Sequence, residues 1–327
     1  MRKLVYVTAA AAALMVAQAA HAVTWDMSSA FPETNFHVKN AKKFAEEVSR
    51  VTDGEVNITV HSGGALGIKG PEALSSVRDG IVPIAEYSFE QQNGEVPFAS
   101  LGAMPGLAMG FKETRTLVDT IRPAMEEIFQ ENNQKLLYVV PWPGQGVYAD
   151  RPIEQVDDLA GYKIRAANAR AVEFFEALGA APVLLPWAEV VPSLATGVVK
   201  GVSTSSSSGV DGKFWEFLSD YTRFDWANPL SVVTVNLDSW NALSEEDQAA
   251  ITELAAKLEP QFWDVAREED EGNLAKLREN GMDVSDVSPE LAGQIAEQSE
   301  KIWDQFAEQA GDRAADAISE YREKVGK

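Results

Sequence analysis

The stretch GYKIRAANAR, residues 161–170, contains the side chain with the clearest chemical potential. Apolar and basic residues alternate across it, which predicts a short strand with one apolar face. A helix pattern follows at once, so Arg165 falls where the strand passes into the helix. A planar guanidinium can hold a carboxylate with two parallel hydrogen bonds, and an arginine here therefore suggests an anion site. The alternative interpretation is that Lys163 and Arg165 form the solvated face of an edge strand.

Polar and aromatic residues also lie at the ends of other predicted strands. Open α/β sheets bind ligands beyond the carboxyl ends of their strands, so these side chains are candidates for one cleft between two lobes. Each is commonplace alone, since a tryptophan is usually core and a serine run is usually a loop. The candidate ligand-binding set is Phe31, Asn35, Glu86, Tyr87, Trp142, Gln145, Arg165, Asn168, Trp187, Thr204 and Ser205.

Catalytic signatures are missing from this sequence. It has no cysteine, and no HExxH, GxSxG or GK[ST] pattern occurs in it. The glycine-rich GGALGIKG segment matches neither a dinucleotide-binding nor a phosphate-binding fingerprint, and we interpret it as a turn. Adjacent acids such as Asp157 and Asp158 are typical of helix starts. We therefore predict a protein that is not an enzyme and holds no metal or cofactor, with a secreted hydrolase or lyase using carboxylates as the alternative.

The first 22 residues are typical of a secretory signal peptide. A basic MRK start precedes an alanine-rich apolar run, and AHA at 20–22 fits the small-x-small cleavage pattern. The alternative, a membrane anchor, would need about 20 strongly apolar residues. We expect cleavage after Ala22 and a soluble periplasmic protein that does not insert into the membrane.

The charge balance limits the partners. The chain has 28 basic and 50 acidic residues and a net charge of −22, and without Arg2 and Lys3 the remaining 26 basic residues leave −24. Such a protein is repelled by nucleic acid and by anionic membrane surfaces. It can bind an anion only through a local positive feature, which strengthens the case for Arg165.

Strand and helix patterns alternate along the mature chain, which favours parallel sheets covered by helices. Strands are predicted near 23–29, 55–61, 81–88, 134–142, 161–167, 181–186, 199–205 and 231–237. Helices are predicted near 35–54, 71–80, 112–133, 169–180, 187–197, 244–281 and from 288 to the end, with a weak point at Gly311. The serine-rich segment 203–209 is interpreted as a strand end with a polar turn, followed by a helix-like segment at 211–221.

The pattern restarts near residue 143, which together with the chain length predicts two lobes. We place 23–142 plus about 230–270 in lobe I, and 143–229 plus about 271–327 in lobe II. We expect the chain to cross between the lobes more than once, and binding to close them like a hinge.

Residues 156–202, VDDLAGYKIRAANARAVEFFEALGAAPVLLPWAEVVPSLATGVVKGV, resemble the most specific part of the DctP family, the solute-binding proteins of TRAP transporters. The helix, strand and glycine loop at 35–67 resemble that family too. The resemblance implies a two-lobed α/β periplasmic binding protein, each lobe a central sheet flanked by helices, with a long helix bridging the lobes. It also implies that Arg165 holds the carboxylate of an organic acid, which is delivered to a membrane permease. Within binding proteins, the alternative is the substrate-binding subunit of an ATP-driven importer.

The sequence departs from the family pattern in the expected pocket. Gln145 stands where many relatives have a second arginine, Thr204 where many have asparagine, and Lys200 where aspartate is usual. A sialic-acid or dicarboxylate specificity therefore does not carry over.

Three tryptophans suggest the shape of the ligand. Trp142, Trp187 and Trp226 would suit a monocarboxylate with an apolar or aromatic body, and Trp226 joins the candidate set on this ground. The alternative is that one or more of these rings belong to the core.

Overall fold

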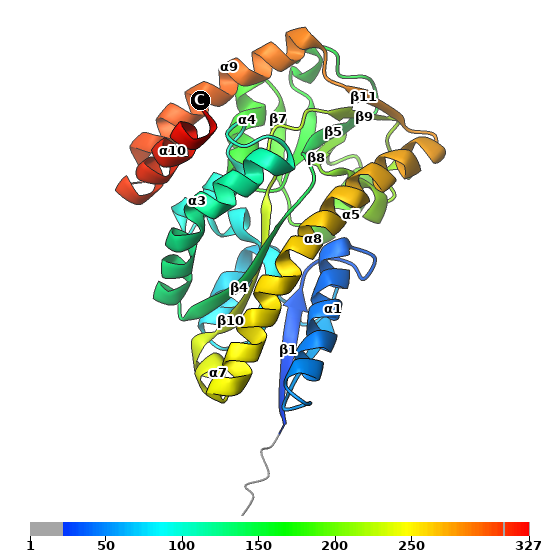
Figure 1. Ribbon diagram of the computed structural model, residues 1–327. Helices are drawn as coiled ribbons and strands as arrows, with labels where there is room; N and C mark the ends of the chain where they lie inside the picture. Colours follow the sequence, from blue (N-terminus) through cyan, green and yellow to red (C-terminus); the bar gives the residue numbers. More distant parts are fainter. Residues whose placement is uncertain (1–21, 310, 327) are drawn as a thin grey trace, which may run out of the picture.

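The computed structural model describes residues 22–309 and 311–326. The predicted signal peptide comprises residues 1–22, and all of it except Ala22 lies outside the described part of the chain. Among the described helices, none has the length and apolar character needed to cross a bilayer. Two β-sheets with helices packed around them make up the molecule (Figure 1).

The first sheet contains five strands. They are β1 (Val23–Ser29), β2 (Val56–His61), β3 (Ile84–Ser88), β4 (Gln134–Pro141) and β10 (Leu230–Asn236). Their order is β2-β1-β3-β10-β4. β1 is parallel to both of its neighbours, whereas β10 is antiparallel to β3 and to β4. β3 and β10 are buried along their whole length, so this sheet forms the centre of a lobe.

The second sheet contains six short strands. They are β5 (Gly146–Ala149), β6 (Lys163–Ala166), β7 (Ala181–Leu184), β8 (Gly201–Thr204), β9 (Asp220–Arg223) and β11 (Asp283–Asp286). Their order is β11-β9-β5-β8-β6-β7. β6 is parallel to β7 and β8, while β5 is antiparallel to β8 and β9. β6 is therefore an interior strand, which excludes the interpretation of Arg165 as an edge-strand charge.

Helices cover the sheets and complete the lobes. They are α1 (Phe36–Val51), α2 (Ala73–Arg78), α3 (Gly110–Glu131), α4 (Ala169–Ala177), α5 (Val190–Ala195), α6 (Ser206–Asp211), α7 (Leu237–Asn241), α8 (Glu245–Glu279), α9 (Pro289–Gln309) and α10 (Asp312–Val325). Within residues 22–309 and 311–326, the 3-10 turns are η1 (Gly70–Glu72), η2 (Phe89–Gln92), η3 (Pro97–Ala103), η4 (Val156–Leu159), η5 (Trp187–Glu189) and η6 (Phe214–Glu216).

Helix α8 connects the two halves of the molecule. It packs on α1 and β4 of the first lobe and on α6 and β11 of the second (Figure 1). Ser244 caps it by accepting the Asp247 N–H at 3.0 Å, its first turn is acidic, and Lys276 and Arg278 lie in its last turn. This charge order complements the helix dipole and supports a helix of 35 residues. The bridging helix implied by the family resemblance is present.

The chain also crosses between the sheets twice as extended backbone. β4 leads through residues 142–145 into β5, and β9 leads through residues 224–229 into β10. The two crossings are paired, because Trp142 N–H donates to Pro229 O at 2.7 Å and Gln145 N–H donates to Ala227 O at 2.9 Å. A paired double crossing of this kind can act as a hinge.

The alternating pattern predicted parallel sheets, whereas both sheets are mixed. The crossings explain this difference. A strand that arrives from the other lobe enters its sheet at the edge facing that lobe. It must then run against the parallel strands that end there, as β10 and β5 do.

The structure differs from the sequence prediction in two local features and in the packing of the last helix. The serine-rich segment forms helix α6, with Ser205 capping it, instead of a polar turn. The four-residue strands β5, β9 and β11 were missed, because each is too short to show a period and β9 lies in the segment predicted to be helix-like. The last helix, α10, packs on α3 of the first lobe. We therefore propose the sequence-based lobe boundaries with α10 moved to lobe I.

Candidate functional site

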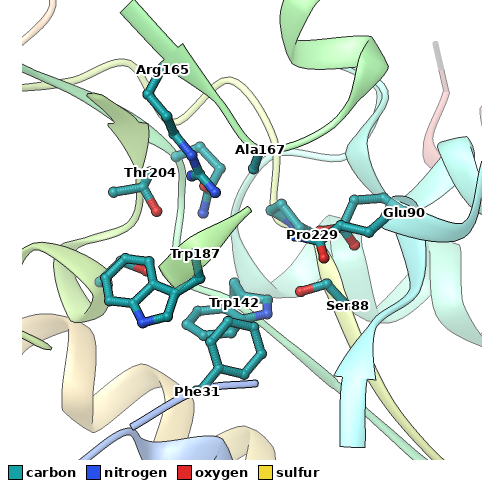
Figure 2. A pocket seen from close by; sticks show the side chains of 12 residues that line it. Phe31, Ser88, Glu90, Trp142, Arg165, Ala167, Trp187, Thr204 and Pro229 are labelled. Carbon is teal, nitrogen blue, oxygen red and sulfur yellow. The ribbon is translucent and has the colours of Figure 1, made fainter. Parts of the chain in front are cut away.

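A pocket lies between the two sheets, at the carboxyl ends of their parallel strands (Figure 2). It encloses about 390 Å³ of space, its opening included. β3, β6 and β8 reach it with their last residues or those that follow, and the two crossings supply the rest of its wall. The lining residues are Phe31, Ser88, Glu90, Gln91, Trp142, Gln145, Arg165, Ala167, Trp187, Thr204, Ser208 and Pro229.

Arg165 is the cation of this pocket. It is 2 % exposed, so it is fully buried rather than partly buried as its place at a strand end suggested. Its Nε–H donates to the Leu185 carbonyl at 3.0 Å, which fixes the guanidinium at the end of β7. Within the described chain, no carboxylate lies within 4 Å of it and its two terminal nitrogens donate no hydrogen bond.

The electrostatics of Arg165 suit an incoming anion. Burial lowers the pKa of the guanidinium to about 10, and the nearby Glu90 carboxyl offsets part of that effect. The side chain is still charged at neutral pH, although it has lost most of its water. A buried charge without a close partner is costly, and an anionic ligand would supply the partner.

The crossings place Trp142 and Gln145 in the wall. Gln145 is buried and donates from Nε2 to the Pro143 carbonyl at 2.9 Å. A Cβ on Gly144 would collide with the Asp225 carboxylate, and one on Gly146 would lie 2.5 Å from the Tyr221 ring. Glycine on both sides of Gln145 therefore lets the two crossings pack closely beside the pocket.

Aromatic rings line the side of the pocket opposite the Arg165 backbone (Figure 2). Phe31 meets Trp142 edge-on, with ring centroids 4.8 Å apart. The glycine loop after β2 holds Phe31 in place, because Gly63 N–H donates to the Phe31 carbonyl at 2.6 Å. Trp187 is half-buried and lies 6.3 Å from the Phe214 ring. These rings give the pocket an apolar body beside its charged end.

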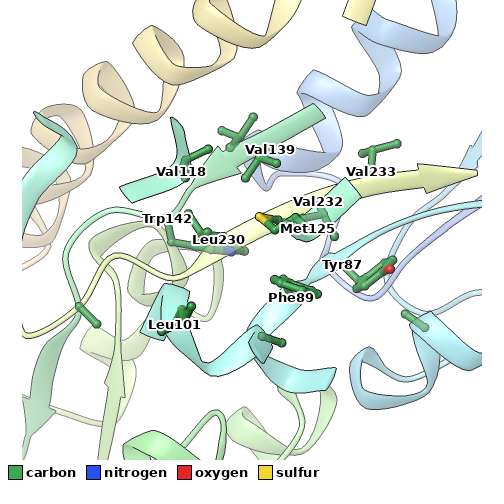
Figure 3. Close-up of a cluster of buried hydrophobic side chains, with 14 of the residues drawn as sticks. Tyr87, Phe89, Leu101, Val118, Met125, Val139, Trp142, Leu230, Val232 and Val233 are labelled. Carbon is green, nitrogen blue, oxygen red and sulfur yellow. The ribbon is translucent and has the colours of Figure 1, made fainter. Parts of the chain in front are cut away.

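Three members of the predicted set belong to the core instead. Tyr87 donates to Gln134 Oε1 at 3.1 Å inside the first sheet (Figure 3). The Glu86 carboxyl accepts from the hydroxyls of Ser29 and Ser231. Trp226 is 2 % exposed, donates to Ser203 Oγ at 3.1 Å and stacks on Phe174 at 5.0 Å. Residues alternate faces along a strand, so a position near its end can face the core instead of the cleft.

Three others are helix caps. Asn168 accepts the Ala171 N–H, and Ser205 accepts the Ser208 N–H. Asn35 accepts the His37 N–H at 2.9 Å and donates from Nδ2 across to Asp211 of the second lobe. None of the three lines the pocket. Asparagine and serine at strand-to-helix turns are often caps, and that function accounts for these positions.

Sequence reasoning missed half of the lining. Ser88, Gln91, Ala167, Ser208 and Pro229 were not proposed, and neither was Glu90. Glu90 was missed because it belongs to the 3-10 turn after β3, a segment with no periodic signal. The available signal was its position, four residues beyond the predicted Glu86 and past the end of a buried strand.

Contacts between the two lobes hold them together. Thr34 Oγ1 and Asn35 Nδ2 donate to the two oxygens of Asp211, each at 2.7 Å. Lys69 of the first lobe lies 3.6 Å from Glu189 of the second. These contacts exist only while the lobes are close, so they favour the closed state.

We predict that Asp211→Ala weakens ligand binding about tenfold while leaving the pocket intact, because hydrogen bonds to a charged group favour closure. Calorimetry gives the affinity, and small-angle scattering of the ligand-free protein should show a larger radius of gyration. Asp264→Ala is the matched control, since this exposed acid on α8 pairs with Arg267 on its own helix. If both variants bind the ligand with equal affinity, the contacts of Asp211 do not favour the closed state.

A metal centre finds no support in the described residues. Within 22–309 and 311–326, no cluster of three or more His, Asp or Glu side chains could hold an ion. His37 is buried behind Trp142, with ring centroids 4.3 Å apart, and burial keeps its pKa well below the usual value, so it is neutral.

Comparison with known proteins shows to which family this chain belongs. Residues 27–310 match the family model DctP, described as bacterial extracellular solute-binding protein, family 7. The chain belongs to this family. A relative from Ruegeria pomeroyi, the ectoine/5-hydroxyectoine-binding periplasmic protein UehA, is 26 % identical over 97 % of this chain and 94 % of its own. A solute-binding protein of Chromohalobacter salexigens is 27 % identical over 90 % of this chain and 88 % of its own.

Solved structures of family members superpose closely on this DctP-family chain. DctP7 of Bordetella pertussis, an extracytoplasmic solute receptor binding pyroglutamic acid, has a TM-score of 0.90 and 30 % identity, over 92 % of this chain and 100 % of its own. A marine metagenome TRAP solute-binding protein with co-purified pyroglutamate has a TM-score of 0.89 and 29 % identity, over 93 % of this chain and 99 % of its own. The two-lobed α/β fold expected from the sequence is confirmed, and so is the resemblance to the DctP family.

Proposed function

We propose that this protein captures a small organic acid in the pocket between its lobes, with Arg165 holding the carboxylate. The observation that carries the proposal is the buried guanidinium, which has a fixed Nε–H and no carboxylate of the protein within 4 Å in the described chain. A ligand carboxylate would be the missing partner of this guanidinium and would accept two hydrogen bonds from its two terminal nitrogens.

The pocket favours a single carboxylate. Of its lining residues, Arg165 is the one cation, and Gln145 is neutral. A second ligand carboxylate would be buried without a counter-charge, which is strongly unfavourable. The 390 Å³ of the pocket includes its opening to solvent, so the enclosed space is smaller and suits a small ligand. Pyroglutamate, the ligand named for two of the similar structures, meets both conditions.

The fold supports a capture-and-release cycle. Pocket groups come from both lobes, so a ligand that contacts both stabilises the closed state by its differential affinity. We infer that the closed complex delivers the acid to the membrane permease of a TRAP transporter and does not change it chemically. Cleavage after Ala22 would release the protein into the periplasm.

A thermal-shift panel tests this function. L-pyroglutamate and other small monocarboxylates should raise the melting temperature in a concentration-dependent way. At a ligand concentration of about one hundred times Kd, the free energy of unfolding should increase by about 2.7 kcal/mol. Dicarboxylates and neutral amides serve as the comparison and should have little effect. A panel in which no organic acid shifts the melting temperature would contradict the proposal.

A further inference from the structure

Two polar atoms of the pocket wall are buried and find no hydrogen-bonding partner within the part of the chain that the structure describes. They are Glu90 Oε2 and the indole Nε1 of Trp142, in side chains that are each 4 % exposed. Both residues line the same cavity as Arg165. Buried polar groups are almost always paired in folded proteins, so two unpaired atoms in side chains that line one cavity point to a ligand that pairs them.

The two atoms lie away from the cation. In Figure 2 the Arg165 side chain enters the pocket from one side, and Ser88, Glu90 and Pro229 lie on the other. A ligand whose carboxylate meets Arg165 therefore presents its opposite end to Glu90. We expect that end to carry polar groups, because Glu90 Oε2 is buried and has no hydrogen-bonding partner among the described residues.

Glu90 is mainly protonated at neutral pH. Burial raises the pKa of its carboxyl to about 8, and donors at its own N–H, Ser88 and Leu230, followed by the charge of Arg165, offset part of that rise. A protonated carboxyl presents one O–H donor and one C=O acceptor side by side.

The surroundings of Glu90 contain few other charges. η3 packs most extensively on η2, followed equally by β10 and η1, and of these three elements only η1 contains an ionisable residue. Glu72 of η1 is exposed and accepts the Lys69 N–H at 3.1 Å. Glu86, earlier on the same strand-to-turn segment, is held by two serine hydroxyls. Arg165 is thus the charged group that acts on Glu90.

We propose that Glu90 and the indole N–H of Trp142 recognise an amide in the ligand, so that the preferred ligand is a small cyclic amide carboxylate of the pyroglutamate type. The proposal rests on the proposed function and adds the residues that determine specificity. In a ring amide the N–H and C=O point to the same edge. The Glu90 carbonyl accepts that N–H, and its O–H donates to the amide oxygen, whose second lone pair takes the Trp142 N–H.

In this arrangement the hydrogen-bonding groups of ligand and pocket are paired, and so are their charges. The ligand carboxylate neutralises Arg165, and the neutral Glu90 meets the neutral amide. A zwitterionic amino acid would instead need an ionised Glu90 for its ammonium group, against the effect of burial.

The first test varies the ligand. Cyclopentanecarboxylate keeps the ring size and the carboxylate of pyroglutamate but lacks the amide. By calorimetry it should bind the wild-type protein at least about a hundredfold more weakly, because it leaves buried polar groups unpaired.

The second test varies the protein. Glu90→Gln has the same shape and also offers one donor and one acceptor, so it should keep the preference for pyroglutamate. Glu90→Leu should abolish that preference. Trp142→Phe keeps a ring but loses the N–H, and should weaken pyroglutamate about tenfold while leaving cyclopentanecarboxylate unchanged.

The third test is pH. Below pH 8 the wild-type Glu90 already carries its proton, so pyroglutamate affinity should be flat. Above pH 8 binding must take up a proton, and affinity should fall about tenfold per pH unit. Calorimetry in buffers of different ionisation enthalpy should show that proton uptake at pH 8.5 in the wild type and none in Glu90→Gln.

The outcomes separate this inference from the proposed function. If Arg165→Ala loses pyroglutamate binding but Glu90→Leu does not, the function stands and the amide recognition is overturned. Equal wild-type affinities for pyroglutamate and cyclopentanecarboxylate would overturn it too, even if Glu90→Leu fails to fold. If no carboxylate binds the wild type, the function itself fails.

Discussion

Arg165→Ala should weaken binding of the organic acid by at least about a hundredfold, with the fold intact. The guanidinium and the ligand carboxylate form a desolvated pair, and removing one partner of such a pair costs roughly 3–5 kcal/mol. At about 1.4 kcal/mol per tenfold, the lower end of that range already exceeds a hundredfold. Calorimetric titration measures the affinity, and the melting temperature of the free protein checks the fold.

Two further variants make this result specific. Arg165→Lys should recover only part of the affinity, because an ammonium keeps the charge but loses the planar fork. Lys163→Ala is the control, since Lys163 is exposed on the same strand and does not line the pocket. Wild-type affinity in Arg165→Ala would show that the site has been placed wrongly.

Trp226→Ala should destabilise the protein by about 3–5 kcal/mol, the usual cost of removing a large buried ring. Trp226 is 2 % exposed and is packed between Phe174 and Phe175, and its N–H is bonded to Ser203. Truncation leaves both a cavity and an unpaired hydroxyl. Denaturant unfolding followed by fluorescence gives the free energy of unfolding.

Trp187→Ala is the matched comparison, because Trp187 is half-buried and lines the pocket. It should lose ligand affinity with little change in the free energy of unfolding, and ligand binding should alter wild-type tryptophan fluorescence. A large loss of stability in Trp187→Ala, or a small one in Trp226→Ala, would reverse the assignment of these two rings.

Most of the fold could be predicted from the sequence because its long elements have strong periods. Helix α8 was expected at 244–281 and runs over Glu245–Glu279, and the apolar strand at 134–142 is β4. The failures are short or context-dependent elements. β5 and β9 are strands because the crossings bring them beside β8 and each other, and no local pattern encodes that pairing.

The site was harder to predict because position along a strand does not determine which way a side chain faces. Arg165, Gln145 and Thr204 line the pocket, whereas Tyr87 and Trp226 face the core. Whether such a side chain lines the pocket or faces the core depends on the packing of the whole lobe. Glu90 could not be inferred from a motif, since only the closed arrangement of both lobes shows that its Oε2 is buried and unpaired.

The most direct measurement is a thermodynamic cycle between Arg165 and the ligand carboxylate. L-pyroglutamate and its carboxamide are titrated into the wild type and into Arg165→Ala. The carboxamide should bind the wild type at least about a hundredfold more weakly than the acid, whereas the variant should bind both equally weakly, so that the whole discrimination is coupled to Arg165. If Arg165→Ala still discriminates between the two ligands by the wild-type factor, the guanidinium does not hold the carboxylate and the account is contradicted.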